Sequence, residues 1–594
     1  MGLADSADSA APAASAAPAA RAESEAPSRR IVIVGGVAAG MSAATRLRRL
    51  DESAAITVVE RGEHVSFAGC GLPYYVGGVI AERDDLLLQT PASLAARFAL
   101  DVRVRTEATA IDRAARTVRV RTTTGPAGAT AEEDLPYDAL VLAPGARPVL
   151  PPVSGMERAL TLRDVADADA LVRAVATAGG DGGPARSAVV LGAGFIGVET
   201  AENLHRRGLA VTLVELADHV LPPLDPEMAA PVAARLREAG VEVRTGVTIA
   251  ELGLREAVLT DGAAVAADLV VAAVGVRPDT ALARAAGLEV DERGGIVVGP
   301  DQRTSDPAIW AAGDAAVKTG AIDGAPAHIA LAQTANRHGR VVADSIMGRR
   351  AAAAPAIGTA IVGVLGLQAA MTGWSERRAR AAGLDVVCVH VHPADHASYY
   401  PGARAMSLKL VAEAGTGRIL GAQGVGPSGV DKRIDVISTA IRGGLRAPDL
   451  ADLETAYAPP FGAAKDPVAM LGLVADNVLS GLTPTLQWHE LDAARAAGAG
   501  LVDVRTPAEY ARGHIPGALN IPVDQLRGRL DALPDGPLIV SCQVGLRGHV
   551  AARLLLQHGR EVRNLDGGYR TWSAVHGAGA VGPEPGPAPA AGEG

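Results

Sequence analysis

The order of apolar and polar positions divides the first part of the chain into alternating strands and helices. Residues 31–34 are uniformly apolar and stop at two glycines, which predicts a short buried parallel strand. A helical pattern follows over residues 39–50, and residues 56–60 are typical of a further strand. The same strand–helix–strand order returns over residues 188–215. Because such alternation builds doubly wound sheets, we expect an α/β fold in which one unit is inserted into another.

The same patterning sets the expected domain boundaries. Near residue 350 the alternation gives way to shorter strands and two helices, which predicts a separate α+β domain. A short linker then precedes a compact α/β unit, and both chain ends have the composition of disordered tails. The predicted division is 1–28 (tail), 29–152 with 266–350 (first unit), 153–265 (inserted unit), 351–478 (α+β domain), 479–485 (linker), 486–577 (last unit) and 578–594 (tail).

Composition and charge narrow the classes of function. The 594-residue chain is 48% hydrophobic but only 3% aromatic, so its cores must be packed mainly from Ala, Val, Leu and Ile. The net charge of -10 does not favour a nucleic-acid partner, because affinity for phosphates needs basic surface. No apolar run approaches the roughly 20 residues of a membrane span, so no membrane partner is expected. Its 3 cysteines cannot form a disulfide framework, which favours a reducing, cytoplasmic setting.

A glycine-rich turn follows the first predicted strand. Its residues, in order, are Gly35, Gly36, Val37, Ala38, Ala39 and Gly40. A tight turn of this kind lets the backbone approach a pyrophosphate, which the N-terminus of the following helix attracts. Glu60, about 20 residues further on at a strand end, can accept a hydrogen bond from a ribose hydroxyl. Val37 replaces the middle glycine of the usual dinucleotide fingerprint.

The second strand–helix–strand unit carries the complete fingerprint. Gly192, Gly194 and Gly197 have the required spacing, and Glu215 ends the next strand. An acid at that strand end favours a free 2′-hydroxyl over a 2′-phosphate, so NADH is expected over NADPH. The alternative is that both glycine turns only pack a helix against a strand. The repetition of turn, helix and terminal acid favours two Rossmann-like dinucleotide sites instead.

The most informative stretch is a single cysteine between two glycines in residues 66–75, SFAGCGLPYY. The glycines beside Cys70 allow a flat ring or a bulky thiol to approach the backbone. No second cysteine stands nearby in the sequence. A partner sulfur would therefore have to come from a small molecule, or Cys70 would have to cycle through a sulfenic acid. The alternative is a buried structural cysteine.

Two further segments, residues 140–145 (LVLAPG) and 304–314 (TSDPAIWAAGD), resemble the flavin-contacting segments of the pyridine nucleotide-disulfide oxidoreductase family. The resemblance implies FAD at the first turn, with Asp314 bonded to its ribityl chain. From the residues alone, Asp314 is an acid after a strand and a glycine, a position that also suits a helix N-cap. The remaining residues assigned to the cofactors are Arg61, Ser66, Gly145, Gly275 and Gly313, and Phe67 is assigned to the substrate.

Within that family, residues 30–475 look like the single-cysteine branch, which holds coenzyme A-disulfide reductases, persulfide reductases, and NADH oxidases and peroxidases. One departure from the pattern is Gly69, where coenzyme A-disulfide reductases usually have Asn. The substitution removes a side chain that could hydrogen-bond to the substrate or to the cysteine sulfur.

The resemblance also implies a homodimer and coenzyme A as a substrate or bound ligand. Tyr399 and Tyr457 match tyrosines that reach the active site of the other protomer, where a phenol can stabilise a leaving thiolate. Arg49 and Lys465 match positions associated with coenzyme A phosphates. Each of these two residues has the alternative of belonging to a solvated basic surface, and for Arg49 that surface would include Arg46 and Arg48.

The last unit carries a second candidate thiol. Cys542 follows an apolar strand and opens a loop that runs to Arg547, before a helix predicted to start near His549. Backbone N–H groups of this loop, the helix dipole and Arg547 would favour a thiolate and stabilise a persulfide. With residues 503–510 and 513–518, the loop resembles single-domain rhodaneses; the alternative is a docking domain without catalysis. Structural ion pairs and caps are expected of Asp503, Arg505 and Glu509.

Alternation along residues 386–392 places Cys388, His390 and His392 on one face of a strand. These side chains could attract a metal, with His396 as the one further ligand nearby. A sheet face with satisfied hydrogen bonds is the stronger interpretation, and no metal is expected.

The combined motifs predict an FAD- and NAD(P)H-dependent reductase that acts on coenzyme A disulfide, coenzyme A persulfide or polysulfide through Cys70, with a sulfur-carrier site at Cys542. The fusion favours this function, because two steps of one pathway on one chain raise the local concentration of the intermediate. Two alternatives stay open. One is an NADH oxidase or peroxidase that cycles Cys70 as a sulfenic acid, and the other is a redox-sensing binding module.

Overall fold

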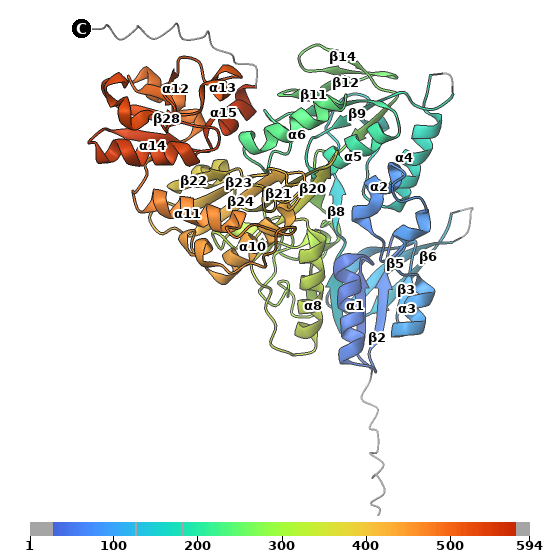
Figure 1. The fold of residues 1–594 in the computed structure, drawn as a ribbon. Helices are drawn as coiled ribbons and strands as arrows, with labels where there is room; N and C mark the ends of the chain where they lie inside the picture. Colours follow the sequence, from blue (N-terminus) through green and yellow to red (C-terminus); the bar gives the residue numbers. More distant parts are fainter. Residues whose placement is uncertain (1–27, 125–127, 181, 578–594) are drawn as a thin grey trace, which may run out of the picture.

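The computed structural model describes residues 28–124, 128–180 and 182–577 (Figure 1). The two predicted tails therefore lie outside the described residues, apart from Ser28. Four units follow one another, from the blue first unit at the lower right of the picture to the red last unit at the upper left. Within the described part of the chain, no helix is long and apolar enough to cross a membrane.

The first unit is built on a parallel sheet with the strand order β17-β7-β1-β2-β3. The predicted strand at residues 31–34 and the predicted helix at residues 39–50 each begin one residue earlier than expected. The elements around this sheet are β1 (Arg30–Val34), α1 (Ala38–Leu50), β2 (Ala55–Val59), α2 (Leu72–Val76), α3 (Pro91–Phe98), β3 (Asp101–Arg103), β7 (Ala139–Leu142), α7 (Ala281–Ala285), β17 (Ile309–Ala311), β18 (Lys318–Thr319), β19 (Pro326–Ala327) and α8 (Ala332–Ile346). An antiparallel sheet of β4 (Thr106–Asp112), β5 (Thr117–Thr124) and β6 (Ala129–Pro136) completes the unit.

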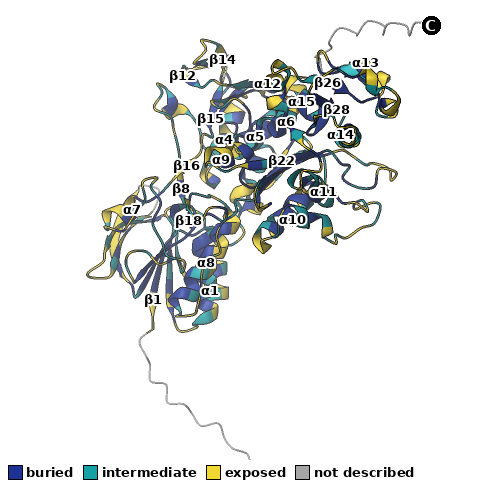
Figure 2. Ribbon diagram, turned by 90° about the vertical axis from the view of Figure 1, so that its left-hand side faces the viewer, coloured by how far each residue is buried: buried dark blue, intermediate teal, exposed yellow. Residues whose placement is uncertain are grey.

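Helices α1 and α8 of this unit pack closely against each other, and a glycine makes their close contact possible. α1 and α8 run side by side (Figure 1). A Cβ on Gly339 of α8 would overlap the carbonyl oxygen of Ala39, so the two backbones touch where a larger residue would hold them apart. Ile33 of β1, Leu47 of α1 and Val342 of α8 are fully buried in one apolar core. Figure 2 shows buried parts of these elements in dark blue.

The second unit repeats the plan with the strand order β11-β10-β9-β15. Its elements are α4 (Val165–Thr177), β9 (Ser187–Leu191), α5 (Phe195–Arg206), β10 (Ala210–Glu215), α6 (Pro226–Glu238), β11 (Glu242–Thr245), β12 (Ile249–Leu252), β13 (Glu256–Leu259), β14 (Ala264–Ala266) and β15 (Leu269–Ala272). The boundary predicted at residue 265 falls one strand too early, because β15 pairs in parallel with β9 inside this sheet. A ribbon of β8 (Ala146–Pro148) and β16 (Val276–Pro278) joins the first and second units.

The third unit is an antiparallel sheet in the order β20-β21-β24-β23-β22. Its elements are β20 (Ala360–Val364), β21 (Leu367–Gly373), α9 (Glu376–Ala381), β22 (Val386–Val391), β23 (Ser407–Glu413), β24 (Ile419–Gly426), α10 (Val430–Gly443) and α11 (Pro467–Leu479). Two helices were expected here and three are present. The extra one, α9, spans 6 residues and is set by the Ser375 cap rather than by an apolar period.

The last unit is a parallel sheet in the order β25-β29-β28-β26-β27. Its elements are β25 (Thr485–Leu486), α12 (Leu491–Ala496), β26 (Gly500–Asp503), α13 (Pro507–Ala511), β27 (Leu519–Asn520), β28 (Leu538–Ser541), α14 (Leu546–Gln557), β29 (Val562–Leu565) and α15 (Gly568–His576). α14 begins three residues before the predicted start at His549, because Gly545, at φ 95°, already turns the chain into the helix.

A buried ammonium group connects the second and third units. Lys409 of β23 is 1% exposed, and its Nζ lies 2.5 Å from Glu227 Oε1, 2.7 Å from Glu376 Oε2 and 2.9 Å from Asp225 Oδ2. These three carboxylates are close enough together to hold a metal ion, but the lysine ammonium supplies the positive charge at their centre. A charge this deep is stable only while its partners surround it, so the contact fixes α6 against the sheet of the third unit.

The same network continues into the last unit through His390. Its Nδ1 lies 2.6 Å from Asp566 Oδ2, and its Nε2 lies 3.1 Å from Glu227 Oε1. Burial opposes a charge on this imidazole, but Asp566 and Glu227 outweigh it and raise the pKa of His390 to about 9. The predicted strand face of Cys388, His390 and His392 is therefore an interface between units, with its histidines hydrogen-bonded.

Replacing Asp566 by Asn is expected to loosen the last unit. Removing one partner of a buried ion pair costs about 3 kcal/mol, so cleavage of the linker at residues 479–485 by a protease should become roughly a hundredfold faster. The raised pKa of His390 makes the wild-type contact pH-dependent. Its stabilisation should be complete below the ordinary histidine value of about 6.5 and be lost as the pH rises through about 9.

The matched control is Asp531→Asn, which removes an exposed carboxylate of the same unit. Its cleavage rate should equal that of the wild type at every pH. Equal acceleration in both variants, or a wild-type rate that does not change between pH 7 and pH 10, would contradict a structural role for the His390–Asp566 pair.

Candidate functional site: the cleft at Cys70 and the loop at Cys542

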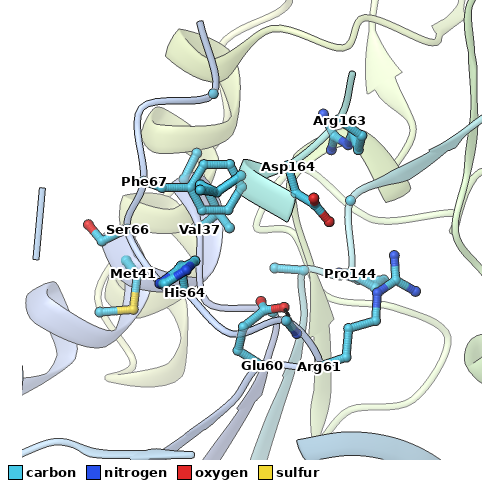
Figure 3. A pocket seen from close by; sticks show the side chains of 18 of the residues that line it. Val37, Met41, Glu60, Arg61, His64, Ser66, Phe67, Pro144, Arg163 and Asp164 are labelled. Carbon is cyan, nitrogen blue, oxygen red and sulfur yellow. Dashed lines mark hydrogen bonds between the residues drawn. The ribbon is translucent and has the colours of Figure 1, made fainter. Parts of the chain in front are cut away.

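A cleft of about 1750 Å³ lies between the first and second units. In the view of Figure 3, Glu60 and Arg61 lie at the bottom of the cleft, with Ser66 and Phe67 on one side and Arg163 on the other. The predicted site residues that line it are Gly35, Glu60, Arg61, Ser66, Phe67, Cys70, Gly145, Gly275, Gly313 and Asp314. The predicted residues outside its wall are Gly36, Gly40, Arg49, Gly192, Gly194, Gly197, Glu215, Tyr399, Tyr457 and Lys465.

The two glycine turns are built in the same way. Gly35 has a φ of 105° and Gly192 a φ of 98°, values that favour glycine. A Cβ on Gly40 would overlap the carbonyl oxygen of Gly35, and a Cβ on Gly197 would overlap that of Gly192. The first and last glycine of each turn are thus required by the packing of a helix against its strand.

The acid at each strand end fastens the turn in front of it. Glu60 accepts hydrogen bonds from the N–H groups of Gly36 and Gly62, both at 2.8 Å. Glu215 accepts from Ala193 at 2.6 Å and Ala217 at 2.8 Å. Sequence reasoning assigned these acids to a ribose hydroxyl only. Each carboxylate oxygen keeps a second lone pair, so the structural contact and a ribose contact are compatible.

The residues present fit a dinucleotide at each turn. α1 and α5 both begin without a side-chain cap, so their first N–H groups are left for an anionic ligand beside the cleft. Gly194 differs from its neighbours, because a Cβ there would meet no atom within 4 Å. The packing of the chain does not require glycine at this position, whereas the close approach of a pyrophosphate does.

Asp314 is held by groups that sequence reasoning missed. It lies in a single 3-10 turn, Gly313–Ala315, and caps no helix; its carboxylate lies 3.2 Å from Arg163 of the second unit. Behind it, buried Lys318 donates to the carbonyl oxygens of Gly313 at 2.5 Å and Ala316 at 2.7 Å. Burial lowers the pKa of Lys318 to about 8, and Asp314 opposes that shift. The lysine clamps the turn that presents Asp314 to the cleft.

Arg61 contributes positive charge at the cleft floor. Its Nη1 lies 2.8 Å from Asp279 Oδ2, and Arg147 contacts the same carboxylate at 2.8 Å. Asp279 is buried, and it carries one negative charge against two guanidinium groups. The cluster therefore keeps one net positive charge, which suits a phosphate or a flavin pyrophosphate.

Cys70 is exposed to the cleft, which excludes the alternative of a buried structural cysteine. It lies in the 3-10 turn Gly69–Gly71 that leads into α2. A Cβ on Gly71 would press on Leu86, so this glycine is needed for packing. A Cβ on Gly69 would meet only Phe67, at 3.8 Å, so packing does not require glycine at this position.

A partly buried acid and a phenol lie near Cys70. Tyr74 of α2 and Glu199 of α5 share a hydrogen bond of 3.0 Å between the two dinucleotide units. Burial raises the pKa of Glu199 to about 7, and Glu202 adds to the shift. Burial and the charge of Glu199 raise the pKa of Tyr74 to about 12. A carboxyl group that titrates near neutrality can store a proton, and no sequence motif indicated this pair.

The two predicted tyrosines meet each other but lie away from the cleft of their own chain. Tyr399 Oη and Tyr457 Oη are 3.1 Å apart, although 58 residues separate them. Their side chains are 75% and 48% exposed, and neighbouring Phe461 is 72% exposed. Three large exposed rings on the third unit are a surface suited to contact with another chain.

Arg49 and Lys465 are both exposed and lie outside the cleft wall. The alternative that Arg46, Arg48 and Arg49 form one solvated basic surface is wrong for Arg48. Arg48 is buried and donates to the carbonyl oxygens of Phe98 and Ala99. Arg46 is also engaged, at 2.8 Å from Asp344. Arg49 is the arginine of this cluster that faces solvent.

The loop at Cys542 is a separate, smaller site in the last unit. Cys542 is fully buried, and its Sγ accepts the N–H of Gly545 at 3.1 Å. Arg505 anchors the loop, because it donates to Gln543 Oε1 at 3.0 Å while it pairs with Asp503 at 2.6 Å. The expected ion pair of Asp503 and Arg505 is therefore present, and it supports the loop from behind.

Arg547 is less available to the thiol than the sequence indicated. Both of its terminal nitrogens are bound by Glu509, at 2.8 and 2.7 Å. Arg547 lowers the pKa of the Glu509 carboxyl to about 2, so this acid stays charged at neutral pH. Glu509 also forms a capping box with Thr506, as expected of a structural cap. The ion pair offsets much of the positive charge that Arg547 could direct at Cys542.

Replacing Glu509 by Gln should make Cys542 more reactive. Removing the carboxylate leaves the Arg547 charge uncompensated, which favours the thiolate and should speed alkylation of Cys542 roughly threefold to tenfold at neutral pH. Mass spectrometry of the Cys542 peptide measures the rate. Thr506→Ala is the control, since it removes the cap contact but keeps the Arg547–Glu509 pair. A slower rate in Glu509→Gln, or an equal gain in both variants, would contradict this role of the ion pair.

Three family models match the chain, one after another. Residues 29–339 match the pyridine nucleotide-disulphide oxidoreductase model, and residues 359–467 match the dimerisation domain of the same name. Residues 487–575 match the rhodanese-like domain. The matches coincide with the first two units, the third unit and the last unit of the structure.

Curated relatives are similar over the first three units. The coenzyme A disulfide reductase of Staphylococcus haemolyticus is 32% identical over 453 residues, which are 76% of this chain and 100% of the relative. An NADH oxidase of Methanocaldococcus jannaschii is 31% identical over 460 residues, which are 76% of this chain and 99% of the relative.

Two solved structures extend the similarity to the last unit. Reduced CoADR-RHD of Bacillus anthracis is 44% identical with a TM-score of 0.89, and the match covers 92% of this chain and 98% of that one. An NAD-dependent persulfide reductase from A. fulgidus is 40% identical with a TM-score of 0.84, and the match covers 91% and 100%.

Proposed function

Because the chain belongs to the pyridine nucleotide-disulphide oxidoreductase family, we propose that it is an FAD-dependent enzyme that uses NADH to reduce sulfur–sulfur bonds. Its proposed substrates are coenzyme A disulfide, coenzyme A persulfide or polysulfide; two relatives are named as a coenzyme A disulfide reductase and an NAD-dependent persulfide reductase. One observation carries the proposal: a lone exposed thiol, Cys70, lies in the cleft between two dinucleotide-binding units of a chain that also bears a thiol loop at Cys542.

Cys70 acts as the sulfur nucleophile of the reductase. Its thiolate attacks one sulfur of the substrate RSSR′, forms the mixed disulfide Cys70–S–S–R and expels R′S⁻. FAD bound at the first turn would supply the two electrons that reduce sulfur, with NADH as their source. Cleavage of the mixed disulfide restores the Cys70 thiolate and releases RS⁻. With a proton for each leaving thiolate, the balance is NADH + H⁺ + RSSR′ → NAD⁺ + RSH + R′SH.

The chain's own residues place the two cofactors and choose between the nicotinamide nucleotides. Gly35 and Asp314 would hold the flavin in the cleft that Cys70 also lines, and Gly194 would leave room for the second pyrophosphate. Glu215 favours NADH, because a 2′-phosphate beside this carboxylate would be repelled. Tyr74 and Glu199 lie between the two nucleotide sites, where they can hold a proton for a leaving thiolate.

The active unit is a homodimer, in this proposal. The dimerisation-domain match and the exposed rings on the third unit support it. Tyr399 and Tyr457 of a second copy approach Cys70 and stabilise the leaving thiolate with their phenols. Arg49 and Lys465 take the phosphates of coenzyme A, which fits their exposure outside the cleft wall.

Cys542 carries sulfane sulfur for the same pathway. The Gly545 N–H donates to its Sγ, and a contact of this kind can also stabilise the charge of a persulfide on this sulfur. The Cys542 thiolate takes the outer sulfur of a persulfide donor RSSH, forms Cys542–S–S⁻ and releases RSH. The reductase then removes that outer sulfur as sulfide, with two electrons that come from NADH. Chemistry of this kind belongs in a reducing compartment, and we place the protein in the cytoplasm on that ground.

A second candidate function is an NADH oxidase or peroxidase. One observation favours it: in the described residues, Cys70 has no second cysteine beside it and is open to small oxidants. The NADH oxidase of Methanocaldococcus jannaschii is a relative of similar identity. In this case Cys70 cycles through a sulfenic acid.

Anaerobic oxidation of NADH tests the proposed function. With coenzyme A disulfide, coenzyme A persulfide or polysulfide as acceptor, Cys70→Ser should lower kcat/KM at least a hundredfold, because the nucleophile is removed. Cys542→Ser should keep the reductase rate and lose transfer of sulfane sulfur. Cys388→Ala, at a buried cysteine away from both sites, is the control. Consumption of NADH only after oxygen or peroxide is admitted would exclude the sulfur reductase and favour the oxidase.

Tyr399→Phe and Tyr457→Phe test the shared site. Loss of either phenol should lower kcat roughly tenfold to a hundredfold while the oligomeric state stays the same. Tyr400→Phe is the control, because its ring is also exposed but no hydroxyl contact joins it to the pair. Mixed dimers of Cys70→Ser and Tyr457→Phe should recover activity, since one of their two sites is complete. No recovery, or an equal loss in Tyr400→Phe, would contradict a site built from two chains.

A further inference from the structure

A second cavity, of about 140 Å³, lies where the second, third and last units meet. Its wall comes from α6, from β22, β23 and the end of β24, and from α15. The polar groups on this wall are Glu227, His390, His392, Ser407, Arg570 and Thr571. The volume holds several water molecules, and therefore also an anion of four or five heavy atoms.

Arg570 is the reason to expect a ligand in this cavity. It lies in the first turn of α15, is partly buried, and lines the cavity. Among the described residues, no carboxylate, carbonyl or aromatic ring accepts its guanidinium group. Burial lowers the pKa of Arg570, and no anion offsets that shift. The guanidinium group keeps accessible surface in the cavity and has no protein acceptor within the described part of the chain, so an anion from solution can bind to it there.

Besides Arg570, one of two hydroxyl groups on the cavity wall can donate a hydrogen bond to a ligand. His392 lies 2.9 Å from Ser407 Oγ through Nδ1 and 2.8 Å from Thr571 Oγ1 through Nε2. Burial, with the charge of Arg570, lowers the pKa of His392 well below its ordinary value, so the ring is neutral. A neutral imidazole donates one hydrogen bond and accepts one. One of the two hydroxyls therefore keeps its own proton for another acceptor, and that acceptor can be a ligand.

The carboxylate on the wall does not repel an anion strongly. Glu227 is already bound by the Lys409 ammonium at 2.5 Å and by the charged ring of His390 at 3.1 Å. Arg570 therefore supplies the uncompensated charge of the cavity, and that charge is positive.

We propose that this cavity binds a small inorganic oxyanion, a sulfur oxyanion or phosphate, through Arg570 and a hydroxyl of Ser407 or Thr571. Backbone hydrogen bonds connect the first turn of α15, which carries Arg570, to the Cys542 loop. Arg570 N–H donates to Gln543 at 3.0 Å, and Tyr569 N–H donates to Cys542 at 2.7 Å. Occupancy of the cavity thus stiffens the start of α15 and the thiol loop that rests on it, whatever substrate the reductase uses.

Titration calorimetry of the full-length flavoprotein with sodium thiosulfate, sulfite, sulfate and phosphate, in a chloride buffer of constant ionic strength, tests the proposal. The wild type should bind at least one of these anions saturably, and Arg570→Gln should weaken that binding at least tenfold. The anion with the highest affinity distinguishes a sulfur oxyanion from phosphate. Arg570→Gln leaves the side chains of the cleft and of the Cys542 loop unchanged. Any anion that binds at those two places would therefore bind equally well to this variant.

Arg527→Gln is the matched control, because it removes an exposed arginine of the same unit. It should bind as the wild type does. Without anion, Arg570→Gln should melt no lower than the wild type, since the charge that it removes has no partner. If Arg570→Gln fails to fold, Arg570→Lys serves instead, and it should weaken binding at least threefold through loss of the forked donor. Equal affinity in wild type and Arg570 variants, or no saturable binding by any of the four anions, would overturn the proposal.

Discussion

The ammonium group of Lys409 connects the second and third units of this protein, and the network around it reaches the last unit. It is fully buried among the carboxylates of Asp225, Glu227 and Glu376, and none of these four charges is stable there without the others. Glu227 extends the network to His390, which in turn binds Asp566 of the last unit. Because a buried charge tolerates little displacement, the network fixes the relative position of α6, the antiparallel sheet and the strand end before α15. The thiol loop at Cys542 rests on that strand end.

The chain uses one construction twice to make its nucleotide-binding units. In each unit a strand stops at a glycine of positive φ, and a helix begins without a side-chain cap. An acid at the next strand end accepts one N–H group of the turn and one from the residue two positions beyond itself. The acid preorganises the turn before any ligand arrives, so little conformational entropy is lost on binding. The turn of the first unit lines the cleft together with Cys70, and the second unit contributes Ile196 of α5 and Val271 of β15 to the facing wall. This arrangement suits an enzyme that passes electrons from one cofactor through another to sulfur.

The three thiols show how environment separates cysteines of one sequence. Cys70 is open to a large cleft, as a group that meets bulky disulfides must be. Cys542 is enclosed in a loop whose Gly545 N–H points at its sulfur, which suits a single added sulfur atom. Cys388 is buried beside the Lys409 cluster, and burial raises the pKa of its thiol, so it stays protonated and inert.

The expected family, fold class and fused rhodanese-like unit are confirmed by the matching family models and solved structures.

The sequence by itself determined whatever depends on neighbours along the chain. Glycine turns, strand-end acids, the isolated Cys70 and the Cys542 loop are local patterns, because backbone angles and helix starts are set within a few residues. The tertiary structure alone decided contacts between residues far apart in sequence. It joined Tyr399 to Tyr457, placed β15 in the second sheet, paired Arg547 with Glu509 and left Arg570 without an acceptor among the described residues. Such contacts depend on how whole units pack, and packing is a property of surfaces that no local motif encodes.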